Sequence, residues 1–413
     1  MANTPSQKVS SRALGFDSAM ITSLFEVLDW VKFWHLEYCK KFRLLIDQKS
    51  ILVYLCEVAI LQEDQSGVSF RYPYMYYYFV ARYFRDHITE DEIRNYIKRM
   101  SQRLHHTESA NIIIFLCYLS KDPYILTMLL EASRALFADY SECDLLGDTK
   151  FISALMPDVP HVVLETKDTG ENHRELLSEE DDLSENTNDG FQNILDEDKT
   201  DKELQEILQV NVAFKTTQIL GQLLRNFTGS LKGEQKFDLA QECYSLGLRV
   251  LSFALSNIKE NQHEMVEAIG EILVSKHPRW PYERLNEEVK YFMFEVMESL
   301  AFVIIRHTSD SVGLERLLLT YDDLLAFNKN ISYRFIDLLV RLENFRGFPK
   351  NETLELFREV RKDRFSAQLL RHMVWYYFYI YPAKHDLRQS VCDKLGIQIQ
   401  PAIKFQPKKL IRG

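Results

Sequence analysis

Apolar side chains recur at helical spacing along most of the second half of the chain. One stripe is formed by positions four or seven residues apart: Leu204, Leu208, Val212, Ile219, Leu223 and Phe227. A second stripe covers residues 289–303, and further helices are predicted over 237–255, 314–327, 332–345, 352–360 and 366–381. Several of the polar breaks between these segments are short, so neighbouring helices are expected to be antiparallel. The pattern of residues 204–400 therefore predicts a mainly α, α-solenoid-like stack of αα-hairpins.

The first ninety residues have a different pattern. Long amphipathic segments over residues 18–46 and 50–58 predict two helices. Short runs of strand-forming residues then flank a Gly-containing loop at 63–67, which predicts a β-hairpin. Pro73 follows at a position where a helix can begin, because the first turn does not use the missing N–H. The order helix, helix, hairpin, helix predicts a winged-helix-like unit over residues 12–89.

Acidic residues concentrate in one segment in the middle of the chain. From Glu165 to Glu203 there are fifteen Asp or Glu and four Lys or Arg, which gives a local charge of −11. The whole chain carries −10, so the remainder carries +1. A segment with so few apolar residues cannot offset the entropy of ordering. We expect a helical unit over residues 90–160, an acidic linker over 161–203 and a basic tail over 401–413.

Composition and missing motifs narrow the classes of function. The six cysteines are far apart and form no C-x-x-C pair, which argues against a zinc site or disulfides and fits a reducing, cytoplasmic location. The longest apolar stretches are far short of the roughly 20 residues that cross a bilayer, so no membrane partner is expected. The sequence has no Walker A, dinucleotide-binding, zinc-protease or nucleophile-elbow motif. We expect no enzymatic activity, no cofactor and no metal. A nearly neutral body neither favours nor excludes a nucleic-acid partner.

The densest feature is an aromatic segment over residues 70–84, F-R-Y-P-Y-M-Y-Y-Y-F-V-A-R-Y-F. Exposed rings beside arginines would form a platform on which nucleobases stack. A helix buried on most sides, with its tyrosine hydroxyls at the rim, explains the same residues. The second interpretation is favoured, because the nearly neutral charge supplies no obvious positive groove. The candidate residues of this core or interdomain helix are Phe70, Arg71, Tyr72, Tyr74, Tyr76, Tyr77, Tyr78, Phe79, Arg82 and Tyr83.

Arg82 and His87 have the R-x-x-x-x-H spacing of the active-site motif of HEPN ribonucleases. In those enzymes the two side chains act on an RNA phosphodiester, so the pair is a candidate RNase site. Tyr83 stands where those motifs favour a polar residue, and so short a pattern arises by chance. Coincidence is therefore the favoured explanation.

Two stretches on either side of the predicted hairpin together resemble a known family. They are L-C-E-V-A-I-L over residues 55–61 and F-R-Y-P-Y-M-Y-Y-Y-F-V-A-R-Y over residues 70–83. They look like the region after the ATPase core of bacterial STAND-type, NACHT-like NTPases, where a winged-helix-like unit ends in such a helix. Residues 111–116, 121–123 and 171–174 add similarity, so the resemblance covers about residues 20–185.

The resemblance implies a multidomain switch, often in antiphage defence, in which a P-loop ATPase module binds ATP and a helical C-terminal region senses a trigger. The present sequence has no Walker A motif, so no nucleotide-binding residue of the family has a counterpart in it. We expect a non-catalytic regulatory or sensor region that docks on an ATPase module supplied in cis or in trans. Its C-terminal helices would bind a protein trigger or ligand. An independent helical adaptor that needs no ATPase is the alternative.

Overall fold

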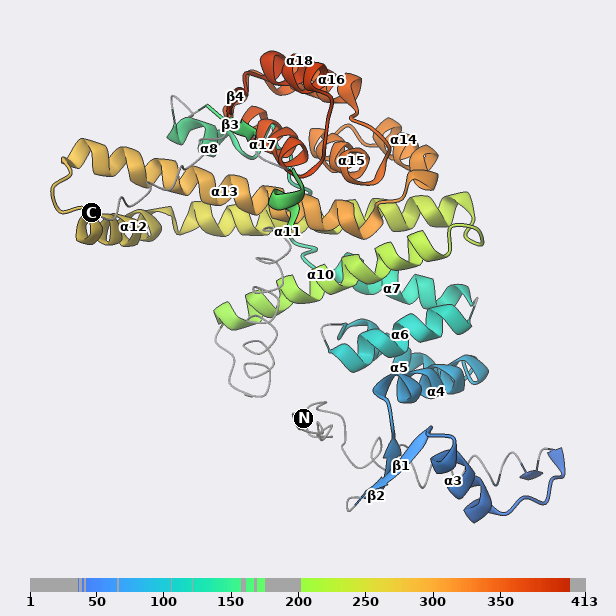
Figure 1. The fold of residues 1–413 in the computed structure, drawn as a ribbon. Helices are drawn as coiled ribbons and strands as arrows, with labels where there is room; N and C mark the ends of the chain where they lie inside the picture. The colour runs from blue at the N-terminus through green and yellow to red at the C-terminus, as the bar shows by residue number, and fades with distance from the viewer. Residues whose placement is uncertain are drawn as a thin grey trace, which may run out of the picture. The chain divides into compact units, whose positions relative to one another are not determined.

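The computed structural model describes Leu36, Cys39, Lys40 and residues 42–64, 67–104, 106–120, 122–156, 161–166, 169–174 and 202–401. Within these residues the chain is mainly helical, as predicted, and it forms two compact units (Figure 1). The first unit contains the described residues up to Ile97 and residues 106–120, and the second contains the remainder. Most of the helix predicted over 18–46, the acidic residues 175–201 and the tail from residue 402 lie outside the described residues.

The first unit contains the predicted hairpin between helices. Its elements are α3 (Gln48–Glu57), β1 (Leu61–Asp64), β2 (Gly67–Phe70), α4 (Pro73–Asp86), most of α5 (Asp91–Ser101) and α6 (Thr107–Leu119). The strands are antiparallel, with Leu61 opposite Phe70, so the hairpin prediction is confirmed. Pro73 is the first residue of α4, as expected for a residue that lacks an N–H.

The core of the first unit lies between α4 and α6. Val80, Ala81 and Phe84 of α4 are buried, and so are Ile112, Ile113 and Leu116 of α6. The ring of Tyr78 meets the ring of Phe115 edge to face, with centroids 6.1 Å apart. This packing places α6 in the same compact unit as the hairpin and α4.

The second unit is built around three long helices. Its elements are α7 (Pro123–Ala135), α8 (Lys150–Leu155), β3 (Val163–Thr166), α10 (Lys202–Asn226), α11 (Gly233–Glu260), α12 (Gln262–Lys276), α13 (Tyr282–Val312), the 3₁₀ turn η2 (Glu315–Leu317), α14 (Leu318–Phe327), α15 (Ile331–Asn344), α16 (Lys350–Val360), α17 (Arg364–Ile380), α18 (His385–Leu395) and β4 (Gln398–Pro401). Helices α10, α11 and α13 pack against one another (Figure 1). Every helix predicted after residue 203 is present, whereas α12 and α18 were not predicted.

Two glycines let the long helices approach closely. A Cβ at Gly221 of α10 would overlap the backbone carbonyl of Ser311 on α13, and one at Gly247 of α11 would overlap the hydroxyl of Thr308. The close contacts of α10 and α11 with α13 therefore require residues without a Cβ at these two positions. Gly270 on α12 has no atom within 4 Å of an added Cβ, so it has no such packing role.

Segments before the acidic residues pack on the C-terminal helices. β3 pairs in parallel with β4, and the backbone N–H of Gln398 donates to the carbonyl of Val162 at 2.9 Å. The indole N–H of Trp375 on α17 donates to the carbonyl of Val163 at 3.0 Å. The buried side-chain amide of Asn172 donates to the carbonyl of Tyr379 at 2.9 Å. Residues 122–174 therefore share a compact unit with residues 202–401, while the predicted boundaries at 90, 161 and 204 stay a prediction.

The aromatic run near the C-terminal end of α17 lies in the core of this unit. Tyr376, Tyr377, Phe378 and Ile380 are buried, and Phe348 stacks on Phe378 with centroids 5.0 Å apart. The helix predicted over residues 366–381 is therefore present, and much of its aromatic run is buried. No helix within the described ranges combines the length and hydropathy needed to cross a bilayer.

Candidate functional site

The N-terminal end of the aromatic segment presents exposed rings. Tyr72 and Tyr74 are 43% and 53% exposed, and their rings stack with centroids 5.5 Å apart. The guanidinium of Arg71 lies 5.8 Å from the centroid of Tyr72, within the range of a cation–π contact. Because these side chains precede the buried turns of α4, they face solvent rather than α6.

The middle of the segment packs within the first unit. Tyr76, Tyr77 and Phe79 are half-buried, and Phe79 stacks on Phe70 of the hairpin with centroids 5.6 Å apart. The hydroxyl of Tyr76 donates to a carboxylate oxygen of Glu108 on α6 at 2.8 Å. Burial, together with the Glu108 charge, raises the pKa of Tyr76, and burial raises the pKa of Glu108. This contact holds α4 against α6 with the proton on the tyrosine.

Arg82 and His87 lie at opposite ends of the last turns of α4, and their role as an RNase pair stays a prediction. Arg82 is exposed on α4, whereas His87 ends the helix with Nδ1 2.9 Å from the carbonyl of Tyr83. The imidazole also stacks on the Tyr83 ring, with centroids 4.2 Å apart. Burial, together with the charges of Glu90 and Glu92, raises the pKa of Tyr83. The contacts of His87 are thus with its own helix end.

Exposed apolar side chains gather in the first unit. Of the twenty large hydrophobic residues exposed within the described part of the chain, ten lie between residues 36 and 74. They are Leu36, Phe42, Leu44, Leu45, Ile46, Val53, Tyr54, Val58, Tyr72 and Tyr74, and we refer to them as the N-terminal apolar surface. Leu45 is fully exposed, and so in large part are Tyr54 on α3 (61%) and Val58, which caps the C-terminal end of that helix (44%). Single exposed hydrophobics are ordinary, whereas a contiguous patch of them is typical of an interaction site.

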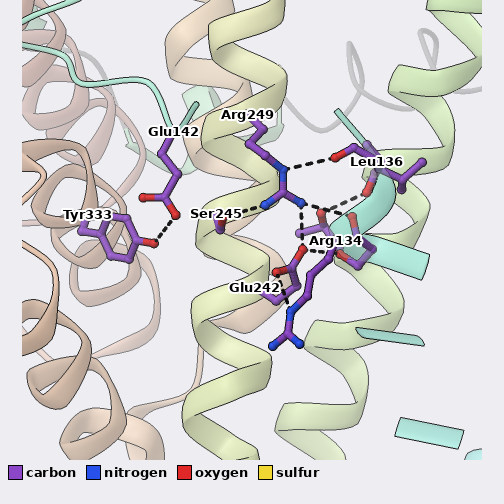
Figure 2. A network of polar contacts seen from close by, with 10 residues as sticks. Arg134, Leu136, Glu142, Glu242, Ser245, Arg249 and Tyr333 are labelled. Atoms are coloured by element: carbon purple, nitrogen blue, oxygen red, sulfur yellow. Dashed lines mark hydrogen bonds and ion pairs between the residues drawn. The ribbon is translucent and has the colours of Figure 1, made fainter. Parts of the chain in front are cut away.

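A buried ion pair within α11 is hydrogen-bonded to the C-terminal end of α7 in the second unit (Figure 2). A guanidinium nitrogen of Arg249 lies 2.8 Å from Oε1 of Glu242, which also accepts from the hydroxyl of Ser133 at 2.7 Å. The same guanidinium donates to the hydroxyl of Ser245 at 2.7 Å and to the carbonyls of Ser133 and Leu136, each at 3.1 Å. Because these carbonyls end α7, the arginine also neutralises the negative end of that helix.

Three further polar contacts lie in this region. Arg134 lies 3.7 Å from Oε2 of Glu242, and the hydroxyl of Tyr333 on α15 donates to Glu142 at 3.0 Å (Figure 2). The side chain of Asn328 donates to the other oxygen of Glu142 at 3.2 Å. These contacts fix α7 and the segment after it to α11, α14 and α15, so the network has a structural role.

Sequence reasoning missed this network, although a signal is present in the sequence. Glu242, Ser245 and Arg249 recur at positions i, i+3 and i+7, which lie on one face of an otherwise apolar helix. Charged residues on a buried face are seldom found without a partner. The pattern therefore indicates an internal ion pair, but the partner carbonyls on α7 carry no sequence signature.

Among the described residues, neither the potential metal ligands nor the thiols of Cys117, Cys143 and Cys243 form a second site. Within the described ranges, no group of three His, Cys, Asp or Glu is placed to hold a metal ion. Burial raises the pKa of the Cys117 thiol to about 12, and it raises the pKa of Cys143 and Cys243 as well. These three thiols are protonated at neutral pH, so they are poor nucleophiles.

A comparison with protein families associates the N-terminal apolar surface with STAND NTPases. The family model Novel STAND NTPase 4 matches residues 31–80, which include α3, the hairpin and the first half of α4. No curated protein and no solved structure matches the chain. The family match and the concentration of exposed apolar residues therefore fall on the same part of the molecule.

Proposed function

We propose that the chain is the non-catalytic regulatory or sensor region of a STAND-like ATPase, and that its N-terminal apolar surface docks on the P-loop ATPase module. The observation that carries the proposal is the coincidence of the STAND NTPase match at 31–80 with ten exposed apolar residues at 36–74. The sequence has no Walker A motif, so the nucleotide site belongs to the partner module, in cis or in trans.

The energetics favour an apolar partner for this surface. Burying one Val or Leu side chain contributes about 1.5–3 kcal/mol, so a few of these ten residues are enough for a specific interface. In this proposal α3, the hairpin and α4 form the winged-helix-like unit that meets the ATPase. The helices of residues 204–400 bind a protein trigger or ligand, and their response reaches the ATPase through the docked unit. A bacterial defence or signalling system is the setting that the family resemblance implies.

The test uses the P-loop ATPase encoded in the same gene or next to it. For a module in trans, the chain and the ATPase are purified separately, and their Kd is measured by calorimetry. For a module in cis, ATP hydrolysis and the melting temperature of the joined protein are measured. Tyr54→Asp and Val58→Asp place charges in the N-terminal apolar surface, and each is expected to weaken binding, or the coupling to ATP hydrolysis, at least about tenfold.

Leu319→Asp is the matched control, because Leu319 is 78% exposed on α14 in the second unit. It is expected to leave binding unchanged. The proposal is wrong if all three variants bind equally well, or if the chain neither binds the ATPase nor changes its rate. Binding of a trigger by the chain alone, with no effect of any ATPase, would support the adaptor alternative instead.

A further inference from the structure

The turn between α12 and α13 carries a rigid group of aromatic and basic side chains. Its sequence over residues 276–284 is K-H-P-R-W-P-Y-E-R, and Figure 1 shows it where α12 turns back into α13. The backbone N–H of Trp280 donates to the carbonyl of His277 at 3.1 Å, which closes a tight turn. Pro278 and Pro281 fix two backbone φ angles within it. The backbone of this turn is therefore held in one conformation before any ligand binds.

Three planar groups are stacked in this turn. The imidazole of His277 lies parallel to the Trp280 ring at 3.9 Å, with an angle of 3° between the planes. The guanidinium carbon of Arg284 lies 4.2 Å from the centroid of the same indole. Two groups this close to one centroid occupy opposite faces of the ring. The outer faces of His277 and Arg284 are therefore left as surfaces on which a further planar group can stack.

Charge and exposure add to this arrangement. Lys276, Arg279 and Arg284 are exposed, and Glu283 is the one acid within the turn, so its net charge is +2 on a chain of −10. Tyr282 is 81% exposed and is the most exposed tyrosine among the described residues. The nearest acids outside the turn are Glu271 on α12 and Glu287 and Glu288 on α13. These acids confine the positive charge to the turn itself.

We propose that the α12–α13 turn binds a short stretch of single-stranded nucleic acid. Bases stack on Tyr282 and on the outer faces of Arg284 and His277, while Lys276 and Arg279 contact phosphates. Base stacking tolerates any sequence, because every base has a π-face. The turn is therefore expected to distinguish single strands from duplexes, but not one base sequence from another. An acidic peptide would use the cations, but it has few planar groups to stack on the outer faces of His277 and Arg284. The proposal concerns a surface outside the N-terminal apolar surface and does not depend on the ATPase partner.

The test is fluorescence anisotropy with the full chain and labelled single strands of RNA and DNA about twelve nucleotides long, at low and moderate salt. With two cations, Lys276 and Arg279, on phosphates, log K is expected to fall with log salt at a slope of about −1.4. Tyr282→Ala is expected to weaken binding about 5- to 150-fold by removing one stacked base. Arg279→Glu is expected to weaken binding and to reduce the salt slope by about 0.7.

Arg316→Glu is the matched control, because Arg316 is exposed on η2 and the charge change is the same. It is expected to bind like the unchanged protein, and all variants are checked for an unchanged melting temperature. The RNA and DNA strands identify which nucleic acid binds more tightly, and binding of either supports the proposal. The proposal is overturned by absence of binding to both strands, by equally tight binding of duplex DNA, or by unchanged binding of Tyr282→Ala. Competition by polyglutamate as strong as that by a single strand would point to an acidic protein instead.

Discussion

Removing the positive charge of Arg249 is the sharpest test of how the second unit is held together. The side chain donates to four acceptors: Glu242, the hydroxyl of Ser245, and the carbonyls of Ser133 and Leu136. Arg249→Met keeps most of the side-chain volume but leaves the Glu242 carboxylate, only 7% exposed, without its closest cation. Breaking a buried pair from one side costs about 3–5 kcal/mol, because the remaining charge is uncompensated.

This cost translates into a measurable shift in melting temperature. For a domain of 150–250 residues, 1 kcal/mol corresponds to roughly 2–4 °C, so Arg249→Met is expected to lower the transition by about 6–20 °C. Circular dichroism would follow the transition of the helices. Hydrogen exchange would show whether α7 is the helix that loses protection, since its carbonyls lose their donor in this variant. The melting temperature of Arg249→Lys is expected to lie between those of Arg249→Met and the unchanged protein. One ammonium keeps the positive charge but cannot reach all four acceptors.

A double variant distinguishes the charge effect from lost packing. In Glu242→Leu/Arg249→Met no buried charge is left unpaired, so the double variant is expected to be more stable than Arg249→Met alone. The reasoning is refuted if the double variant loses the sum of the two single losses. A shift of less than about 2 °C for Arg249→Met would refute it as well.

Substitutions at Phe84, Glu343 and Gly221 test other parts of the structure. Phe84→Ala is expected to cost about 3–5 kcal/mol by leaving a cavity, whereas Tyr74→Ala changes stability by no more than about 0.5 kcal/mol; chemical unfolding measures both. Burial and the carboxyl of Asp310, which is hydrogen-bonded to Glu343, raise the folded-state pKa of Glu343 from 4.5 to about 9. The protonated Glu343 therefore stabilises the fold fully below pH 4.5, and this contribution is lost as the pH rises toward 9. The free energy of unfolding falls by at most about 1.4 kcal/mol per pH unit, and Glu343→Gln should flatten this pH dependence. Gly221→Ala is expected to lower the melting temperature, because its Cβ overlaps α13, whereas Gly270→Ala raises unfolding free energy by about 0.4–1 kcal/mol.

Much of the helical framework could be predicted from periodicity alone. The segment predicted over residues 332–345 forms α15 at Ile331–Asn344, and the one over 366–381 forms α17 at Arg364–Ile380. These helices have wide apolar faces, so their spacing is clear. The hairpin could be predicted too, because its two strands are adjacent in sequence and a Gly-containing loop joins them.

What could not be predicted depends on contacts between distant residues. β3 and β4 have four residues each and pair across more than two hundred positions, so local propensity carries no information about them. α12 has no buried residue, and its weak amphipathic pattern hides it from a search for apolar stripes. In the candidate site, the aromatic segment was evident from composition. Which of its rings are exposed depends on where α6 packs, and this was not evident.

The placement of charged and apolar groups separates folding from recognition in this chain. The Arg249 network lies inside the second unit, where its carbonyl and carboxylate acceptors are already satisfied within the chain, so a partner has nothing left to bind there. The N-terminal apolar surface is the opposite case: its ten side chains stay exposed although α4 and α6 have a packed core beside them. If stability alone determined these residues, polar side chains would serve as well at Leu45 or Val53. Substitutions in the network should therefore change unfolding without changing association, and substitutions in the apolar surface should do the reverse.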